Sequence, residues 1–266
     1  CQSGKAKRRG AKDGKDQEQK NQLSILAPLA SWRFDPKILR MAGPLHPYLD
    51  LVAARAPAAP RDWLLSRATG LDPESFALVY SGAGRRLGLS SVEPSADEVK
   101  VLEAAQLLVP RGWPLSAVAR AALLALACAK MDRAARLALA ENVFRTGDND
   151  ERSALLKALS ILPEPESFVD LAIDACRSHV QAVFEAIACE NPYPMRFFPE
   201  HNFNQMVLKS FFTGIAVERI EGLAARRSPE LARMAEAYAS ERRAAGRSVP
   251  PDLHLALGTS AASAPR

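Results

Sequence analysis

Residues 115–162 read LSAVARAALLALACAKMDRAARLALAENVFRTGDNDERSALLKALSIL, and the pattern predicts three successive helices. Residues 115–129 are apolar almost throughout, which indicates a helix buried on all sides. A second helix is expected over 132–145, and a turn at 147–150 leads to a third over 150–161. Ala and Leu, both strong helix formers, dominate this stretch. It therefore predicts an all-α protein.

Upstream of this stretch, the sequence predicts further helices near 61–68 and 73–81. Asp72, Pro73 and Glu74 supply an N-cap, a first helical residue and an acidic first turn. Gly82 and Gly84 are expected to end that helix. Gly82-Ala-Gly84-Arg85-Arg86-Leu-Gly88 resembles a phosphate loop, but it follows a helix and lacks the GK[ST] ending, so a helix C-cap is favoured.

A further helix is predicted just before residues 115–162. Ser95 and Glu98 form a capping box, after which Val101, Ala105 and Leu108 share one face. A short helix is expected over 23–32, in the N-terminal part of the chain. Downstream of residue 162, helices are expected over 166–176 and 178–189, from about Glu200, and from the cap at Ser228.

No segment alternates apolar and polar residues for long enough to predict a strand. Helix starts recur about every 15–20 residues across 95–190, a spacing typical of paired antiparallel helices. The predicted fold class is all-α, with stacked antiparallel helices in a HEAT-like arrangement or an irregular helical bundle. One domain is expected over 23–255, followed by a flexible C-terminus over 256–266.

The net charge of +5 is concentrated in the N-terminal tail. Residues 1–20 hold seven basic and three acidic residues, whereas the other 246 residues hold 28 basic and 27 acidic ones. Because the body has almost no excess positive charge, nucleic-acid binding is not expected. The tail over 1–22 lacks apolar periodicity and is predicted to be disordered and basic. It is either a solubilising arm or an arm that binds a membrane surface or nucleic acid.

The cysteines favour a reducing compartment. Cys128, Cys176 and Cys189 lie in apolar helical runs without metal-like spacing, so they are expected to be reduced and structural in a cytoplasmic protein. Lipid anchoring through Cys1 is an alternative. No run of 18 apolar residues occurs, so no transmembrane segment is expected.

The candidate site lies in residues 183–214, where aromatics, prolines and amides interrupt the Ala/Leu-rich pattern. Asn191-Pro192-Tyr193-Pro194 is expected to form a rigid extended or turn segment. On the helix after it, His201, Gln205 and Lys209 share one polar stripe, and Asn204 adjoins this stripe. The packing side of this helix is expected to consist of apolar residues: Phe203, Met206, Val207 and Phe211.

On the helix before that segment, Gln181, Glu185 and Cys189 are spaced by four. If the two stripes face one another, a carboxylate, amides, an imidazole and an ammonium would form a binding site for a polyhydroxylated or phosphorylated small molecule. In the alternative, Glu185 and Lys209 form a buried ion pair and the amides bind loop carbonyls.

Other chemistry has less support. His46, His179, His201 and His254 are not spaced with carboxylates or thiols as metal ligands, so no metal site and no cofactor is predicted. Arg85 is a further candidate for anion binding, because it lies in the glycine-rich segment.

AVFEAIACENPYPMRFFPEHNFNQMVLKSFFTG (182–214), RIEGL (219–223) and SPELARMAEAYASERRAAGR (228–247) resemble the C-terminal signature of the EboA family. GRRLG, Arg111-Gly112-Trp113 and FRTGDNDERSALLKALSILPEPE resemble its earlier segments. The resemblance covers roughly residues 60–255 and is most specific at ENPYP and NQMVLK. The candidate site residues that match the family's motif are Glu185, Asn191, Tyr193, Asn204, Gln205 and Lys209.

The resemblance implies a role in making or moving a prenylated cyclitol-type metabolite. EboA proteins are encoded beside enzymes of the prenyltransferase, cyclase and hydrolase types, which are therefore the expected partners. The resemblance implies no catalytic residues. Two function classes follow: a non-catalytic binding or scaffold protein that serves these enzymes, or an enzyme acting on a small phosphorylated or cyclic polyol. In the second, Glu185 is the general base and Lys209 its electrostatic partner.

Overall fold

The computed structural model describes residues 46–258, and they divide into two compact units. The first unit holds residues 46–94 and 111–147, and the second holds 95–110 and 148–258. The predictions for the basic tail, for Cys1 and for the helix over 23–32 lie outside the described residues, as do residues 259–266 of the predicted flexible C-terminus. The single domain over 23–255 stays a prediction.

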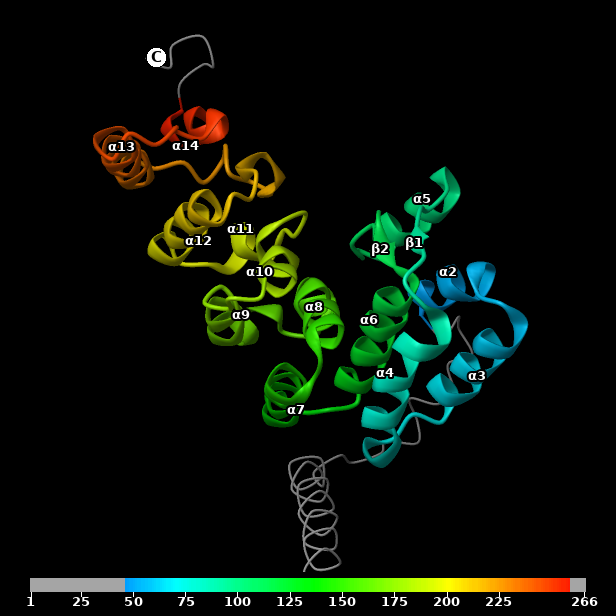
Figure 1. Cartoon of the computed structure of the whole chain (residues 1–266). Helices are drawn as coiled ribbons and strands as arrows, with labels where there is room; N and C mark the ends of the chain where they lie inside the picture. Colours follow the sequence, from blue (N-terminus) through cyan, green and yellow to red (C-terminus); the bar gives the residue numbers. More distant parts are fainter. Residues whose placement is uncertain (1–45, 259–266) are drawn as a thin grey trace, which may run out of the picture. The chain divides into compact units, whose positions relative to one another are not determined.

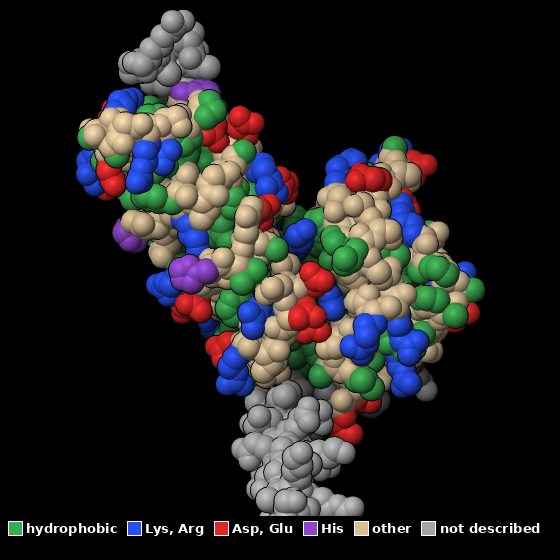
Figure 2. All heavy atoms as spheres, in the orientation of Figure 1, with side chains coloured by type: hydrophobic (Ala, Val, Ile, Leu, Met, Phe, Trp, Pro, Cys, Tyr) green, Lys and Arg blue, Asp and Glu red, His purple; other side chains and the backbone are tan. Residues whose placement is uncertain are grey.

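Both units are helical, so the predicted all-α class is confirmed. The described residues hold 13 α-helices, several short 3-10 helices and one two-stranded antiparallel sheet. In this sheet β1 (Ser91–Val92) pairs with β2 (Trp113–Pro114). Lys and Arg side chains are interspersed with Asp and Glu on the face of the molecule shown in Figure 2.

The first unit is built around α6 (Leu115–Cys128), which packs against α2 (Pro47–Arg55) and α4 (Pro73–Leu87). Every residue of α6 except Leu126 is buried, as its apolar sequence predicts. The remaining helices of this unit are α3 (Ala58–Thr69), which contacts α2, α4 and α6, and α7 (Arg133–Thr146).

Helix α4 continues through Gly82 and Gly84 and ends at Gly88, so the predicted end at the first two glycines is wrong. A Cβ at Gly84 would lie 2.7 Å from Nη2 of the buried Arg120. Gly88 has a φ of 71°, in the left-handed region where glycine is favoured, and it is the C-cap. Gly84 therefore serves close packing, and Gly88 ends the helix.

In the second unit, the helices from α8 to α14 follow one another in sequence order (Figure 1). The α-helices of the second unit are, in chain order, α5 (Ala96–Ala104), α8 (Asn149–Ala158), α9 (Val169–Ala175), α10 (Gln181–Ala188), α11 (Tyr193–Phe197), α12 (Glu200–Thr213), α13 (Pro229–Ala244) and α14 (His254–Leu257). Helix α10 contacts α8, α9, α11 and α12, while α13 contacts α12 and α14. The HEAT-like character of this stack stays a prediction.

The 3-10 helices of the second unit are η3 (Leu159–Ile161), η4 (Pro165–Phe168), η5 (Val217–Arg219) and η6 (Pro251–Leu253). The capping box of Ser95 and Glu98 is confirmed, as is the cap at Ser228. Within residues 46–258, no helix is both long and apolar enough to cross a membrane.

Two local predictions in the second unit are corrected. The Asn-Pro-Tyr-Pro segment passes into the short helix α11, which begins at Tyr193. The two prolines permit this because Pro is tolerated at a helix N-terminus, where N–H groups lack intrahelical acceptors. Helix α5 ends at Ala104 and packs through Leu102, whereas Val101 is 58% exposed, so the predicted face containing Val101 is not the packed one.

Candidate functional site

Helix α12 carries a packing face and a polar face, as predicted. The predicted packing residues are all buried: Phe203, Met206, Val207 and Phe211. On the polar face, His201 and Gln205 are exposed and Lys209 is half-buried. The spacing of four residues places these three side chains on successive turns of the helix.

These three side chains line one cavity of about 290 Å³, together with residues that include Ile173, Cys176 and Arg177 from α9 and the turn after it. We call it the α9–α12 cavity. Asn202 adds a further amide, and Phe198 and Met206 add apolar surface. Apolar walls with a few convergent polar groups are typical of small-molecule sites.

Lys209 is held in place by the end of α9. Its Nζ donates hydrogen bonds to the carbonyls of Cys176 and Ser178, both at 2.6 Å, and lies 4.6 Å from the centroid of the Phe184 ring. A cation near the C-terminus of a helix is favoured by the helix dipole. Burial lowers the pKa of Lys209. An ammonium has three N–H donors, so the two carbonyls leave one for a ligand.

The charge balance of the cavity favours an anionic ligand. Among the described residues that line it, Arg177 and Lys209 are basic and none is acidic. Arg177 also donates to the exposed Asp174 at 3.2 Å, which offsets part of its charge. Burial raises the pKa of the Cys176 thiol to about 12, so this side chain is neutral.

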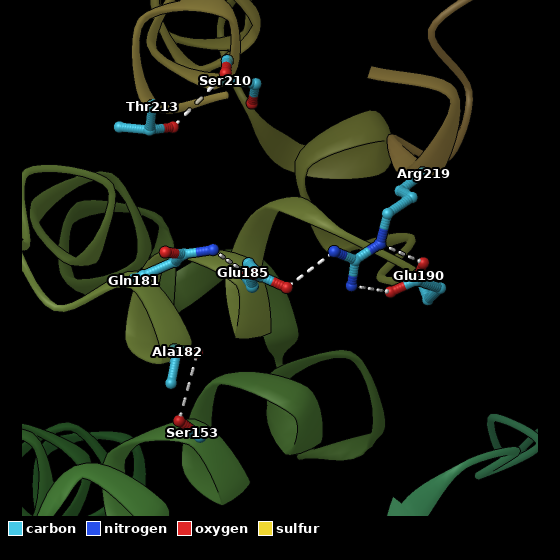
Figure 3. A network of polar contacts seen from close by, with 8 residues as sticks. All are labelled: Ser153, Gln181, Ala182, Glu185, Glu190, Ser210, Thr213 and Arg219. Atoms are coloured by element: carbon cyan, nitrogen blue, oxygen red, sulfur yellow. Dashed lines mark hydrogen bonds and ion pairs between the residues drawn. The ribbon is translucent and has the colours of Figure 1, made fainter. Parts of the chain in front are cut away.

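Glu185 belongs to a different group of contacts (Figure 3). Its Oε2 accepts from Nη1 of Arg219 at 2.6 Å, and its Oε1 accepts from Nε2 of Gln181 at 2.7 Å. Arg219 also binds both carboxylate oxygens of Glu190, at 2.8 and 3.0 Å. The guanidinium therefore joins two carboxylates.

The alternative in which Glu185 and Lys209 form an ion pair with one another is wrong, because each side chain binds other partners. Each has a separate set: Arg219 and Gln181 for Glu185, and two carbonyls for Lys209. The hydrogen bond from Arg219 lowers the pKa of Glu185. A carboxylate with a lowered pKa is a weaker general base than an ordinary one.

Asn191 and Tyr193 are buried and do not line the α9–α12 cavity. Nδ2 of Asn191 donates to the carbonyls of Leu156 and Ala186, at 3.1 and 2.9 Å, and its Oδ1 accepts from the N–H of Tyr193. The Tyr193 hydroxyl donates to the carbonyl of Pro165 at 2.6 Å. Asn191 therefore binds backbone carbonyls, but these belong to helices α8 and α10 and not to loops, as the alternative had it.

Two further candidates lie elsewhere. Asn204 is 1% exposed, and its Nδ2 donates to Oγ of Ser228, the cap of α13, at 3.4 Å. Arg85 is exposed on α4, which belongs to the first unit. The structure thus brings together His201, Gln205 and Lys209 from the predicted set.

Sequence reasoning missed Arg177, Arg219 and Arg226. Arg226 donates to the carbonyls of Met195 and Phe198, at 2.6 and 2.7 Å, and so supports the segment that carries Phe198 into the cavity wall. Of these three, only Arg219 could have been found from the sequence, because it is the first residue of RIEGL (219–223), one of the segments that resemble the EboA family.

Across residues 46–258, no group of three or more His, Cys, Asp or Glu side chains is arranged to hold a metal ion. A family model described as metabolite traffic protein EboA matches residues 62–258. No curated protein and no solved structure matches the chain.

Proposed function

The chain belongs to the EboA family, and from this premise we propose that it is a non-catalytic binding protein for a small polar metabolite. The ligand occupies the α9–α12 cavity. The observation that carries the proposal is the convergence of His201, Gln205 and Lys209 on this one cavity, with Arg177 beside them.

The chemistry of these side chains supports an anionic or polyhydroxylated ligand. Lys209 and Arg177 supply charged donors for a phosphate or carboxylate, and the Gln205 amide both donates and accepts hydrogen bonds. Ile173, Phe198 and Met206 provide apolar contact beside them. The cavity volume of about 290 Å³ is compatible with a ligand built on a single small ring.

The family description supports a role in metabolite handling rather than in one chemical step. We propose that the protein serves a pathway for a prenylated cyclitol-type metabolite, in the cytoplasm, beside enzymes of the prenyltransferase, cyclase and hydrolase types. The lowered pKa of Glu185 speaks against the alternative in which this residue is a general base.

Native mass spectrometry of the full chain, purified from cells that express the pathway enzymes, tests this proposal. The wild-type protein is expected to retain a small-molecule adduct that Lys209→Met and Gln205→Ala lose. Lys130→Met is the matched control, because Lys130 is also half-buried and donates to a carbonyl, that of Leu71, in the first unit. This variant should keep the adduct.

Three results would contradict the proposal. A wild-type protein without an adduct, bound instead to a pathway enzyme, would indicate a scaffold without a ligand. An adduct that survives both cavity variants would place the ligand elsewhere. Turnover of the released ligand by the purified protein would identify an enzyme.

A further inference from the structure

A second hollow lies beside the α9–α12 cavity, between α12 and α13. Its volume is about 370 Å³, and we call it the α12–α13 groove. Leu208 and Phe212 line it from α12, and Met234, Ala237 and Tyr238 line it from α13.

The two hollows share part of their walls. Gln205 and Lys209 line both, so the polar stripe of α12 runs along the boundary between them. A molecule bound on one side of these two side chains can therefore extend past them to the other side.

The charged side chains differ on the two sides of this boundary. Among the residues that the structure describes, the wall of the α9–α12 cavity holds no acidic one, whereas the groove wall carries Arg233 and Glu241 beside its apolar side chains. In the groove, Phe212 is 65% exposed and lies edge-on to Tyr238, with ring centroids 4.8 Å apart. The half-buried Met234 is unbranched and polarizable, which suits it to apolar groups of varied shape. The guanidinium of Arg233, also on the groove wall, is engaged by both carboxylate oxygens of Glu230, at 2.7 and 2.8 Å.

We infer that the ligand is amphipathic, with an anionic head in the α9–α12 cavity and an apolar chain that crosses Gln205 and Lys209 into the α12–α13 groove. The inference rests on the proposed function, because it places the head at the same site. It adds that contacts between the apolar chain and the groove strengthen binding independently of the head, so that a groove variant can remove this contribution alone.

Isothermal titration calorimetry of the full chain with inorganic phosphate, methyl phosphate and hexyl phosphate tests the inference. A fully buried methylene strengthens binding about fourfold. Because the groove is open to solvent, hexyl phosphate is expected to bind the wild-type protein roughly 10- to 100-fold more tightly than methyl phosphate. Phe212→Ser should remove most of this difference and leave the affinity for inorganic phosphate unchanged.

Leu78→Ser is the matched control, because Leu78 is an exposed apolar residue of α4, at 70% exposure. It should leave the preference for hexyl phosphate intact. A protein that binds inorganic phosphate but gains nothing from the hexyl chain would overturn the inference and leave the proposed function standing. Failure of all three probes to bind would overturn the inference by removing its anionic head, whereas the proposed function also accommodates an uncharged polyhydroxylated ligand.

Two further results would also overturn the inference. Equal loss of hexyl phosphate affinity in Phe212→Ser and Leu78→Ser would mean that the chain has no specific contact with the groove. A dimer in analytical ultracentrifugation that Phe212→Ser dissociates would assign the groove to a second copy of the chain.

Discussion

Arg219 and Glu190 hold one another through three hydrogen bonds, although they lie 29 residues apart in the chain. The N–H of Glu190 donates to the carbonyl of Arg219 at 2.9 Å, and the guanidinium binds both oxygens of the Glu190 carboxylate. Glu190 has a φ of 46°, which residues other than glycine rarely adopt. The contact therefore fixes the turn between α10 and α11.

Arg219→Gln is expected to lower the free energy of unfolding by roughly 1 kcal/mol, because it removes the guanidinium that joins Glu185 and Glu190. Urea denaturation measures this loss. In a double-mutant cycle with Glu185→Gln, the coupling energy should be about 0.5–1 kcal/mol. Arg233→Gln, at an exposed pair with Glu230, should have little effect. Equal losses in both arginine variants would contradict the central role of Arg219.

The stability of the protein should depend on pH through Glu185. Because its pKa in the folded protein is lowered, mainly by the hydrogen bond from Arg219, folding favours the charged form. The stabilisation is present above the ordinary Glu pKa of 4.5 and is lost as pH falls through the lower, folded value. Urea unfolding at pH 5, 4 and 3 should show a smaller loss for Glu185→Gln than for wild type. Parallel curves would rule out this contribution.

Lys209→Met should lower stability by about 1–2 kcal/mol, because the carbonyls of Cys176 and Ser178 lose their donor. Lys130→Met should cost less, because the bond from Lys130 to the carbonyl of Leu71 is longer, at 3.3 Å. Thermal unfolding of both variants measures the difference. A Lys209→Met variant as stable as the wild type would show that the two carbonyls do not depend on Lys209.

Asn191→Ala should be the most damaging change at the Asn-Pro-Tyr-Pro segment, at about 2–4 kcal/mol, because it leaves buried carbonyls and an N–H without partners. Asn202→Ala provides a control at a half-buried amide on α12 and should change stability by less than about 0.5 kcal/mol. Denaturant midpoints compare the two. A neutral Asn191→Ala would return this residue to the ligand-binding candidates.

Gly84→Ala is expected to destabilise the protein by roughly 1–2 kcal/mol, although Ala is the better helix former. The new Cβ would lie 2.7 Å from Nη2 of Arg120, which is buried and donates through Nε to the carbonyl of Tyr80. In an Arg120→Met background the same change should cost less. Additive effects in this double-mutant cycle would mean that the close approach has no energetic consequence.

Local sequence signals were sufficient for most helices. The capping residues Ser95 and Ser228, the apolar run over 115–129 and the two faces of α12 were all predicted from neighbours within a few residues. Capping and amphipathic spacing act over one or two helical turns, so they can be identified without knowledge of the fold.

The sequence by itself therefore determined the all-α class and the stripe of His201, Gln205 and Lys209, because both depend on helical periodicity. Only the tertiary structure decided the partners. Glu185 is hydrogen-bonded to Arg219, which lies 34 residues away in the chain, and Lys209 donates to the carbonyl of Ser178, which lies 31 residues away. The continuation of α4 through Gly84 likewise involves the distant Arg120. Such contacts are set by how helices pack, and packing depends on side chains that no local window contains.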